Sequence, residues 1–364
     1  MVLATATAAQ TAFSLVTFAL PSIGPEIADE FDLSLAFMGV VLAASLLGTG
    51  LALYPAGVAV GRWGGRTVML AGTAISTAGL FGAAFAPSAP VLVAMLFLSG
   101  VGTAAVPIAS IGAVFDVFPI DRRAWALGVR QMGVPLARIL GAILLPALDH
   151  VGGSRAALLL CAAATVSFGA LFAVVGAGGA PSASADGRRP RARLAPLLAI
   201  PGMRRLLTVS FFYVLALQAT LVFLVPAARD AGLSDLASNA AFFLLQISAA
   251  AARVVWGRIA DRGAGRRRAR TLVETGIAAT AGALVFALAL HAGTALTLVA
   301  AAGIAFGTMG WNAIVYATAG ERAGPALAAQ AVSVQATLVF SVSAVSTPGL
   351  GASRAPSAGT SSGA

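Results

Sequence analysis

The sequence of 364 residues contains no lysine, a single cysteine and only two histidines. One cysteine excludes an intrachain disulfide and a thiolate metal cluster. His150 and His291 lie far apart at predicted loop edges, so they do not form a metal site. No Walker motif, zinc-ligand spacing or nucleophile–base constellation is present. We therefore expect no metal, no cofactor and no enzymatic activity.

Charged residues are also scarce, at 10% of the chain, against about 25% in soluble domains. Hydrophobic residues make up 59%, and the mean hydropathy is +0.93. The 23 basic residues, all arginine, exceed the 13 acids and give a formal net charge of +10. In a soluble protein this charge would suggest a nucleic-acid partner, but arginines gathered in cytoplasmic loops explain it without one. We expect a polytopic membrane protein that contacts the lipid bilayer and no nucleic acid.

Apolar runs of about 20 residues are long enough to cross about 30 Å of hydrocarbon as helices. A different segment, 178–205, is rich in Pro, Ser, Gly and Arg and separates six such runs from five. We predict an all-α protein with a six-helix bundle over 1–177, a linker over 178–205, a five-helix bundle over 206–347 and a disordered tail over 348–364. The eleven predicted spans are 2–21, 36–57, 67–86, 90–112, 124–147, 154–177, 206–226, 237–259, 271–290, 294–317 and 325–347.

The distribution of arginine predicts the orientation. The loops after the second, fourth, sixth, eighth and tenth runs hold 17 of the 23 arginines, whereas the opposite loops and the tail hold three. Because basic residues favour the cytoplasmic side, we expect the N-terminus and the 178–205 linker to be cytoplasmic. The expected protein is a multi-pass monomer of the cell membrane, either plasma or inner.

The two halves carry an internal repeat with an offset of 200 residues. An ordered series of matches favours two parallel half-repeats, an architecture found in transporters that rock one half against the other. The matching pairs are Leu33 and Leu233, Ser34 and Ser234, Gly57 and Gly257, Arg62 and Arg262, and Arg66 and Arg266.

A glycine- and arginine-rich motif follows the eighth run and reads G-R-I-A-D-R-G-A-G-R-R-R from Gly257. Its first-half counterpart reads G-V-A-V-G-R-W-G-G-R from Gly57, with Gly61 at the position of Asp261. The pair resembles the repeated loop motif of the major facilitator superfamily, and the resemblance covers all eleven runs. It implies a gating contact between the halves on the cytoplasmic side; the alternative is that the arginines only anchor the topology. The implied gating residues are Gly57, Arg62, Gly64, Arg66, Gly257, Asp261, Arg262 and Arg266.

Two further arginines lie inside predicted helices. The run from Gly128 to Leu136, G-V-R-Q-M-G-V-P-L, resembles a motif of the cyanate-permease-like branch. Arg253, four residues before the motif glycine, resembles an anion-binding arginine of nitrate transporters. The resemblance implies that Arg253, with Arg130 and Gln131, contacts the substrate. Arg130 could instead reach the membrane interface, and Arg253 could serve a structural ion pair, although no acid is predicted at its depth.

Other polar residues in the runs either complete a binding site or hold helices together. The candidates for the site are Gln10, Tyr213, Gln218 and Asn312. Arg138 is deep in its run, so it either lines a cavity or disturbs packing.

The expected function is alternating-access transport of a small solute, with a small anion favoured by the arginines. No acid is predicted at mid-membrane depth, which disfavours a proton relay through an embedded carboxylate. The superfamily usually has twelve helices, and we expect the twelfth to be missing here. That expectation keeps a second reading open, in which the protein is a non-transporting membrane sensor or a truncated remnant.

Overall fold

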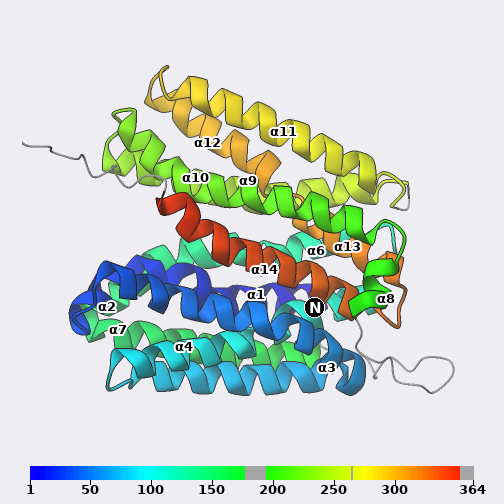
Figure 1. The fold of residues 1–364 in the computed structure, drawn as a ribbon, viewed down its shortest axis with the longest axis horizontal. Coiled ribbons are helices and arrows are strands. Elements are labelled where there is room, and N and C mark those ends of the chain that lie inside the picture. The colour runs from blue at the N-terminus through cyan, green and yellow to red at the C-terminus, as the bar shows by residue number, and fades with distance from the viewer. Residues whose placement is uncertain (177–193, 264, 353–364) are drawn as a thin grey trace, which may run out of the picture.

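The computed structural model describes residues 1–176, 194–263 and 265–352, and every element in these ranges is a helix (Figure 1). Most of the predicted linker and the last twelve residues of the predicted tail lie outside the described residues. The helices are α1 (Val2–Ala19), η1 (Leu20–Ile23), α2 (Gly24–Glu30), α3 (Leu35–Ala84), α4 (Ala89–Thr103), α5 (Ala105–Val117), α6 (Arg123–Gln131), α7 (Gly133–Val175), α8 (Leu194–Ala199), α9 (Met203–Asp230), α10 (Asp235–Asp261), α11 (Arg268–Ala289), α12 (Thr294–Thr308), α13 (Asn312–Ala323) and α14 (Ala328–Ala352).

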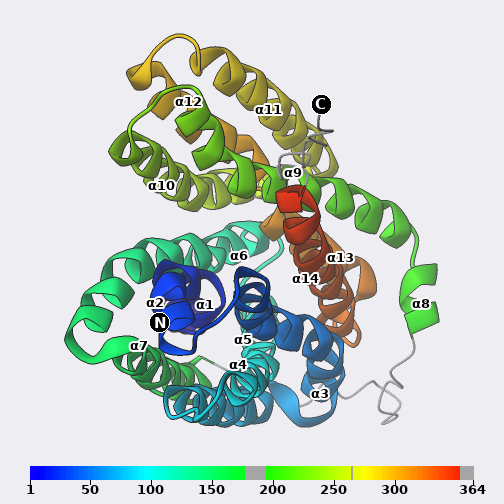
Figure 2. The same cartoon turned by 60° about the vertical axis from the view of Figure 1, so that its left-hand side comes forward.

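The helices form two groups. Helices α1 to α7 pack around one another, and α9 to α12 lie on the opposite side of the molecule (Figures 1 and 2). Helices α13 and α14 connect the groups, since α13 packs on α6 and α14 packs on both α3 and α9. The last two helices of the predicted second bundle therefore lie at the junction of the two groups.

Nine helical segments of the described residues are long and apolar enough to cross a membrane. Two of them, Phe37–Ala84 and Arg123–Val175, have 48 and 53 residues. Each is broken where glycine adopts a positive φ, at Gly64 with φ 81° and at Gly153 with φ 68°. A crossing needs about 20 residues, so both segments have the length for two crossings. The count of eleven crossings stays a prediction.

Glycines allow the two groups to touch through their backbones. A Cβ atom at Gly128 in α6 would lie under 3.0 Å from the carbonyl oxygen of Arg253 in α10. A Cβ atom at Gly257 would lie 2.5 Å from the carbonyl oxygen of Ala124. A side chain of any size would separate the helices, so this crossing of α6 and α10 requires glycine.

The apolar core shows where the halves are joined. We call the end of the molecule that holds Arg123, Arg268 and Arg322 the arginine-rich end. Toward this end a single core combines residues of both groups, among them Leu127 and Trp311. Toward the opposite end each group has a core of its own. The halves are therefore packed together at the arginine-rich end and separate at the other.

Candidate functional site

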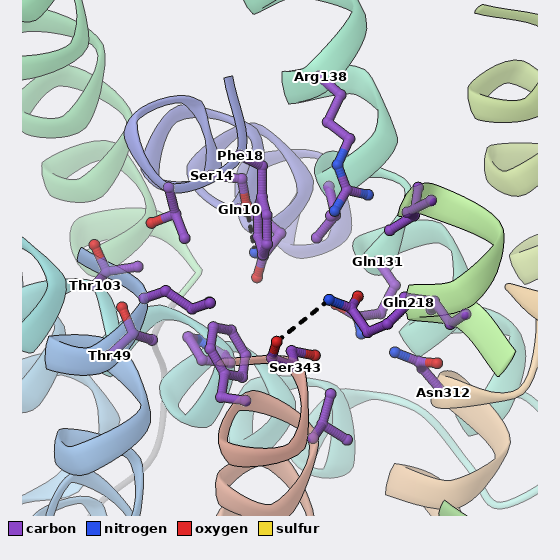
Figure 3. Close-up of a pocket in the computed structure, with 18 of the residues that line it drawn as sticks. Gln10, Ser14, Phe18, Thr49, Thr103, Gln131, Arg138, Gln218, Asn312 and Ser343 are labelled. Carbon is purple, nitrogen blue, oxygen red and sulfur yellow. Dashed lines mark hydrogen bonds between the residues drawn. The ribbon is translucent and has the colours of Figure 1, made fainter. Parts of the chain in front are cut away.

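A cavity of about 330 Å³ lies between the two groups of helices (Figure 3). Its walls come from both halves, with Gln10 and Phe18 on α1 facing Gln218 on α9 and Asn312 on α13. It lies beyond the shared core and is lined toward the arginine-poor end by apolar residues such as Phe242. The position matches a substrate cavity enclosed by two halves that move against each other.

Two arginines, one from each half, line this cavity. Arg138 of α7 points into it, and its Cζ atom lies 4.6 Å from the centre of the Phe18 ring (Figure 3). Arg253 of α10 is 3% exposed, and its Nη1 donates to the carbonyl oxygen of Ala249 at 3.1 Å. The Nε of Arg253 has no hydrogen-bond partner among the described residues. Among the residues that the structure describes, the lining contains no Asp or Glu, so these two charges have no counter-ion there.

Four of the predicted polar residues line the cavity as well. Gln10 donates from Nε2 to the hydroxyl of Ser14 at 2.8 Å, and Gln218 donates to the Ser343 carbonyl at 3.5 Å. Asn312 is 7% exposed, and its Oδ1 accepts no hydrogen bond from the described residues. Together with Gln131 and the two arginines, these amides surround a polar space with both donors and acceptors.

Arg130 lies behind this wall and does not line the cavity. Its side chain is fully buried, so it does not reach the membrane interface either. Its guanidinium donates to the Oε1 of Gln10 and, at 3.1 Å, to the Oε1 of Gln131. The structure therefore places Arg130 as the group that orients two lining amides, in place of the direct substrate contact that the sequence suggested.

Tyr213 is the second candidate that the structure places outside the cavity. Its hydroxyl donates to the Leu272 carbonyl and lies 2.8 Å from the hydroxyl of Thr275. Its ring stacks on Trp311 with the ring centres 5.3 Å apart. These contacts join α9 to α11 and α13, so the residue holds the second half together.

Sequence reasoning left Arg138 open between lining a cavity and disturbing packing, and it overlooked Phe18 and Tyr316. Arg138 did carry a usable signal, because a charge within an apolar run almost always faces a cavity or a partner. Tyr316 is 3% exposed and lines the cavity from α13. Nothing in a run of apolar residues distinguishes an aromatic that lines a cavity from one that fills a core.

The arginine-rich end is closed by a set of charged contacts that we call the latch, formed by Asp261, Arg268, Glu321 and Arg123. Asp261 accepts hydrogen bonds from the backbone N–H groups of Ala124 at 3.1 Å and of Trp125 at 2.8 Å, where α6 begins. Arg268 pairs with Asp261 at 3.1 Å and also with Glu321, which lies 3.8 Å from Arg123. A carboxylate at a helix N-terminus is stabilised by the backbone dipoles, so the latch joins α10 of one half to α6 of the other.

The first-half counterpart of the latch has no carboxylate. Gly57 packs on Ser333 and Ala329 of α14, but a Cβ atom at Gly61 would meet only the side chain of Gln330, at 3.6 Å. The other predicted gating residues of the motifs lie in the same two connections. Arg62, Arg66 and Arg262 are exposed, Arg266 donates to the Gly263 carbonyl at 3.1 Å, and Gly64 forms the break in α3.

Known proteins share both the sequence pattern and the fold. Human monocarboxylate transporter 11 is 32% identical over 253 residues, which cover 66% of this chain and 51% of that protein. An uncharacterized MFS-type transporter of Mycobacterium tuberculosis is 25% identical over 316 residues, which cover 86% of this chain and 70% of that protein. The chain thus spans about half the length of the first relative.

Solved structures match almost the whole chain at low identity. The proton:xylose symporter XylE has a TM-score of 0.78 at 13% identity, and the match covers 97% of this chain and 88% of the XylE chain. The human organic anion transporter MFSD10 has a TM-score of 0.75 at 16% identity, and the match covers 95% of this chain and 91% of the MFSD10 chain. The family model of the Major Facilitator Superfamily matches residues 3–348 of this chain. The chain therefore belongs to the Major Facilitator Superfamily of membrane transporters.

Proposed function

We propose that this protein carries a small organic anion across a membrane by alternating access. One observation carries the proposal: a guanidinium from each half, Arg138 and Arg253, lines one cavity that has no carboxylate in its lining. Burying an uncompensated charge inside a membrane protein is costly. A bound anion supplies the missing counter-charge.

The chemistry of the cavity favours a carboxylate with an apolar body. An arginine offers a planar fork of donors that fits a carboxylate with two hydrogen bonds. Phe18, Phe242 and Phe340 provide apolar surface beside the two guanidiniums. A volume of about 330 Å³ limits the substrate to a small solute.

Two likenesses support an anionic substrate. One relative is named as a monocarboxylate transporter, and one protein of the same fold as an organic anion transporter. The run from Gly128 to Leu136 retains its resemblance to the cyanate-permease-like branch. Since the cavity lining has no acid, the proposal includes no proton relay through a cavity carboxylate.

The proposed orientation places the arginine-rich end and the N-terminus in the cytoplasm of a cell that carries the protein in its plasma or inner membrane. The shared core and the latch then close the cytoplasmic end, so the structure represents an outward-facing state. The same proposal has eleven crossings and a monomeric carrier. The two long segments broken at Gly64 and Gly153 would each contribute two crossings.

Substrate binding and closure of the cavity are coupled in this proposal. Arg138 and Arg253 line the same cavity, so their positive charges repel each other across it. Bringing the halves together would strengthen this repulsion, whereas an anion held between the arginines offsets it. The anion therefore binds the closed cavity more tightly than the open one, which is the difference that drives a conformational change.

Transport by the purified protein in proteoliposomes tests the proposal. We expect counterflow of radiolabelled benzoate or lactate and none of neutral solutes of the same size. Arg253→Ala should reduce anion affinity at least tenfold, because a charge-assisted hydrogen bond contributes about 1.5–3 kcal/mol. Arg253→Lys keeps the charge without the planar fork and should retain part of the affinity.

Arg229→Ala is the matched control, since Arg229 is exposed and pairs with Asp235 at the opposite end of α10. An unchanged affinity in a folded Arg253→Ala protein would contradict the assigned site. A protein that folds but moves no solute of either class would instead favour a membrane sensor.

A further inference from the structure

Three arginines beside the cavity have no acidic partner among the described residues. Arg130, Arg138 and Arg253 take part in none of the ion pairs that join these residues. Arg130 is fully buried and donates to the neutral amides of Gln10 and Gln131. Arg253 donates to a backbone carbonyl, and Arg138 lies over an aromatic ring. The walls of the cavity and the layer behind them therefore carry three positive charges that the neighbouring side chains do not neutralise.

Two of these charges are built into the contact between the halves. Arg253 is 3% exposed and lies at the crossing of α6 and α10, where a Cβ atom at Gly128 would overlap its carbonyl oxygen. Arg130 follows Gly128 on α6, and its Nε is buried without a partner in the described part of the chain. Neither guanidinium reaches water outside the junction, so a movement of the halves does not remove its charge from there.

Closing the arginine-poor end around an empty cavity is therefore unfavourable. The two groups of helices have separate cores at this end, and the cavity has to close here before it opens on the other side. Closure expels water, and the repulsion between like charges rises as the dielectric around them falls. Each guanidinium also loses hydration that no other group replaces. The empty protein therefore passes with difficulty from one arrangement to the other.

The protein's own acids do not take the place of a bound anion. No carboxylate lines the cavity as far as the structure describes its walls. On the arginine-rich side, Asp261 and Glu321 are both engaged by Arg268 in the latch. Binding a proton or a metal cation would add positive charge instead of removing it. A bound anion is the partner that offsets the charge of the cavity while it closes.

We propose that the protein is an exchanger, in which an anion leaves on one side of the membrane only when another anion enters from the opposite side. This inference rests on the proposed transport of a small organic anion and adds the mode of transport to it. The halves change over readily with an anion bound and slowly without one, because the anion stabilises the closed cavity and the empty cavity lacks that stabilisation. The exchange needs no coupling cation, and the two anion gradients set its direction.

Efflux from proteoliposomes tests the mode of transport. Vesicles that contain the purified full chain are loaded with radiolabelled lactate and diluted into buffer with or without unlabelled lactate, and vesicles without protein give the leak. Valinomycin with equal potassium on both sides keeps the membrane potential at zero, so the movement of net charge does not limit efflux. External lactate should accelerate efflux at least tenfold, because the loaded protein returns faster than the empty one.

Two outcomes of this experiment separate the exchange from the proposed function. Saturable efflux at the same rate in both buffers would overturn the exchange and leave the transport of an organic anion intact. No saturable efflux in either buffer would overturn both.

Replacing Arg138 with Gln tests whether the charge of the cavity imposes the exchange. The variant removes one lining charge, so at saturating lactate the ratio of the two efflux rates should fall to about two or less. Arg138→Lys keeps the charge and should keep the ratio, as should Arg229→Gln, which removes an exposed arginine paired with Asp235. An unchanged ratio in an Arg138→Gln protein that transports lactate would overturn the proposal. If that variant does not fold, Arg253→Gln makes the same test from the other half.

Spin labels measure the closure without any transport. Val151 of α7 and Leu236 of α10 are 86% and 82% exposed at the arginine-poor end, one on each half. In buffer whose only small anion is the probe, the label distance should stay long until lactate is added, and a shorter distance should then appear. Arg138→Gln should show the shorter distance without lactate. A large population at the shorter distance in the unchanged, anion-free protein would show that the empty cavity closes, which would overturn the exchange.

Discussion

Arg138 and Arg253 differ in how firmly the fold holds them. The guanidinium of Arg253 donates to its own helix and is 3% exposed, so its position is set by α10. Arg138 is half-buried and contacts the ring of Phe18. A cation over an aromatic ring gains a modest energy, about 0.5–2 kcal/mol. Arg138 is therefore free to turn from the ring to a substrate.

Replacing Arg138 with Gln should weaken binding of an anionic substrate by about 10- to 100-fold, because it removes a charged hydrogen bond of about 1.5–3 kcal/mol. It should also allow the empty cavity to close, since the repulsion from Arg253 is gone. Affinity is measured by calorimetry on the purified protein, and closure by distances between spin labels on the two halves. Arg138→Lys should show neither closure nor a full loss of affinity. Equal affinities for Arg138→Gln and the unchanged protein would assign the site to Arg253 alone.

The residues of the cavity could be predicted only in part. Arg253, Gln10, Gln131, Gln218 and Asn312 were found because polar side chains are rare in apolar runs and few places other than a cavity accommodate them. The same reasoning could not separate Arg130 from the lining. Gln131 is its neighbour in α6, but its other partner, Gln10, lies on α1, and the distance to Gln10 depends on packing that a single sequence does not reveal.

The crossing of α10 and α6 is reinforced by the carboxylate of Asp261. Asp261 is 4% exposed and accepts two backbone hydrogen bonds in addition to the pair with Arg268. In the first half, the residue equivalent to Asp261 is Gly61, which has no side chain to accept a hydrogen bond near α14. The junction of the halves is therefore asymmetric, with one charged closure and one formed by packing alone.

Asp261→Asn should shift the protein away from the state that is closed at the arginine-rich end. An asparagine side chain has one acceptor oxygen and no negative charge, so it cannot replace all the hydrogen bonds that Asp261 accepts. The contact should lose about 1.5–3 kcal/mol of stabilisation. Distances between spin labels at the exposed positions Trp63 and Ala269 report the opening. Asp235→Asn removes an exposed acid at the other end of the same helix and serves as the control. An identical distance distribution in both variants would show that packing alone keeps this end closed.

Glycine at the helix crossing has a separate test. Gly257→Ala would place a methyl group 2.5 Å from the carbonyl oxygen of Ala124, and overpacking of this kind costs about 1–3 kcal/mol. We expect a lower melting temperature and an opened arginine-rich end. Gly303→Ala on α12 meets nothing within 4 Å, so it should be neutral or stabilising by up to about 1 kcal/mol. Equal melting temperatures for the two variants would contradict the close crossing.

At the level of elements, hydropathy located the apolar helices and left gaps where the two long segments break, but it did not identify the residue at each break. The predicted spans overlap the nine apolar segments of the described residues, and their ends run up to three residues past them, because length and apolar character define a crossing but not its exact bounds. The gaps between the predicted spans, 58–66 and 148–153, contain Gly64 and Gly153, where these breaks occur. The particular glycine could not be singled out, since the chain has 41 glycines. Which glycine adopts a positive φ is decided by the neighbouring helices.

The whole molecule combines a joined end with a divided end. The shared core and the latch close the arginine-rich end, and the separate cores leave room for the cavity at the other. Membership of the superfamily could be predicted from the paired motifs, because the repeat fixes their places in both halves. Which end of the molecule is joined could not be predicted, because it depends on packing between helices that a single sequence does not reveal.

The one-sided distribution of arginine has a consequence for proteolysis. Trypsin cuts after lysine and arginine, and this chain has no lysine. On the arginine-poor side the described residues offer only Arg155 and Arg229. Arg155 donates to the Ala84 carbonyl at 3.1 Å and covers the Phe85 ring, whereas Arg229 is half-exposed in the last turn of α9.

Trypsin added to one face of sealed vesicles should therefore cut first after Arg229 and yield two large fragments, while trypsin on the other face should produce many small ones. The two fragment patterns on a gel would identify the cytoplasmic face of the unmodified protein. A ladder of small fragments from protease added outside intact cells would reverse the proposed orientation.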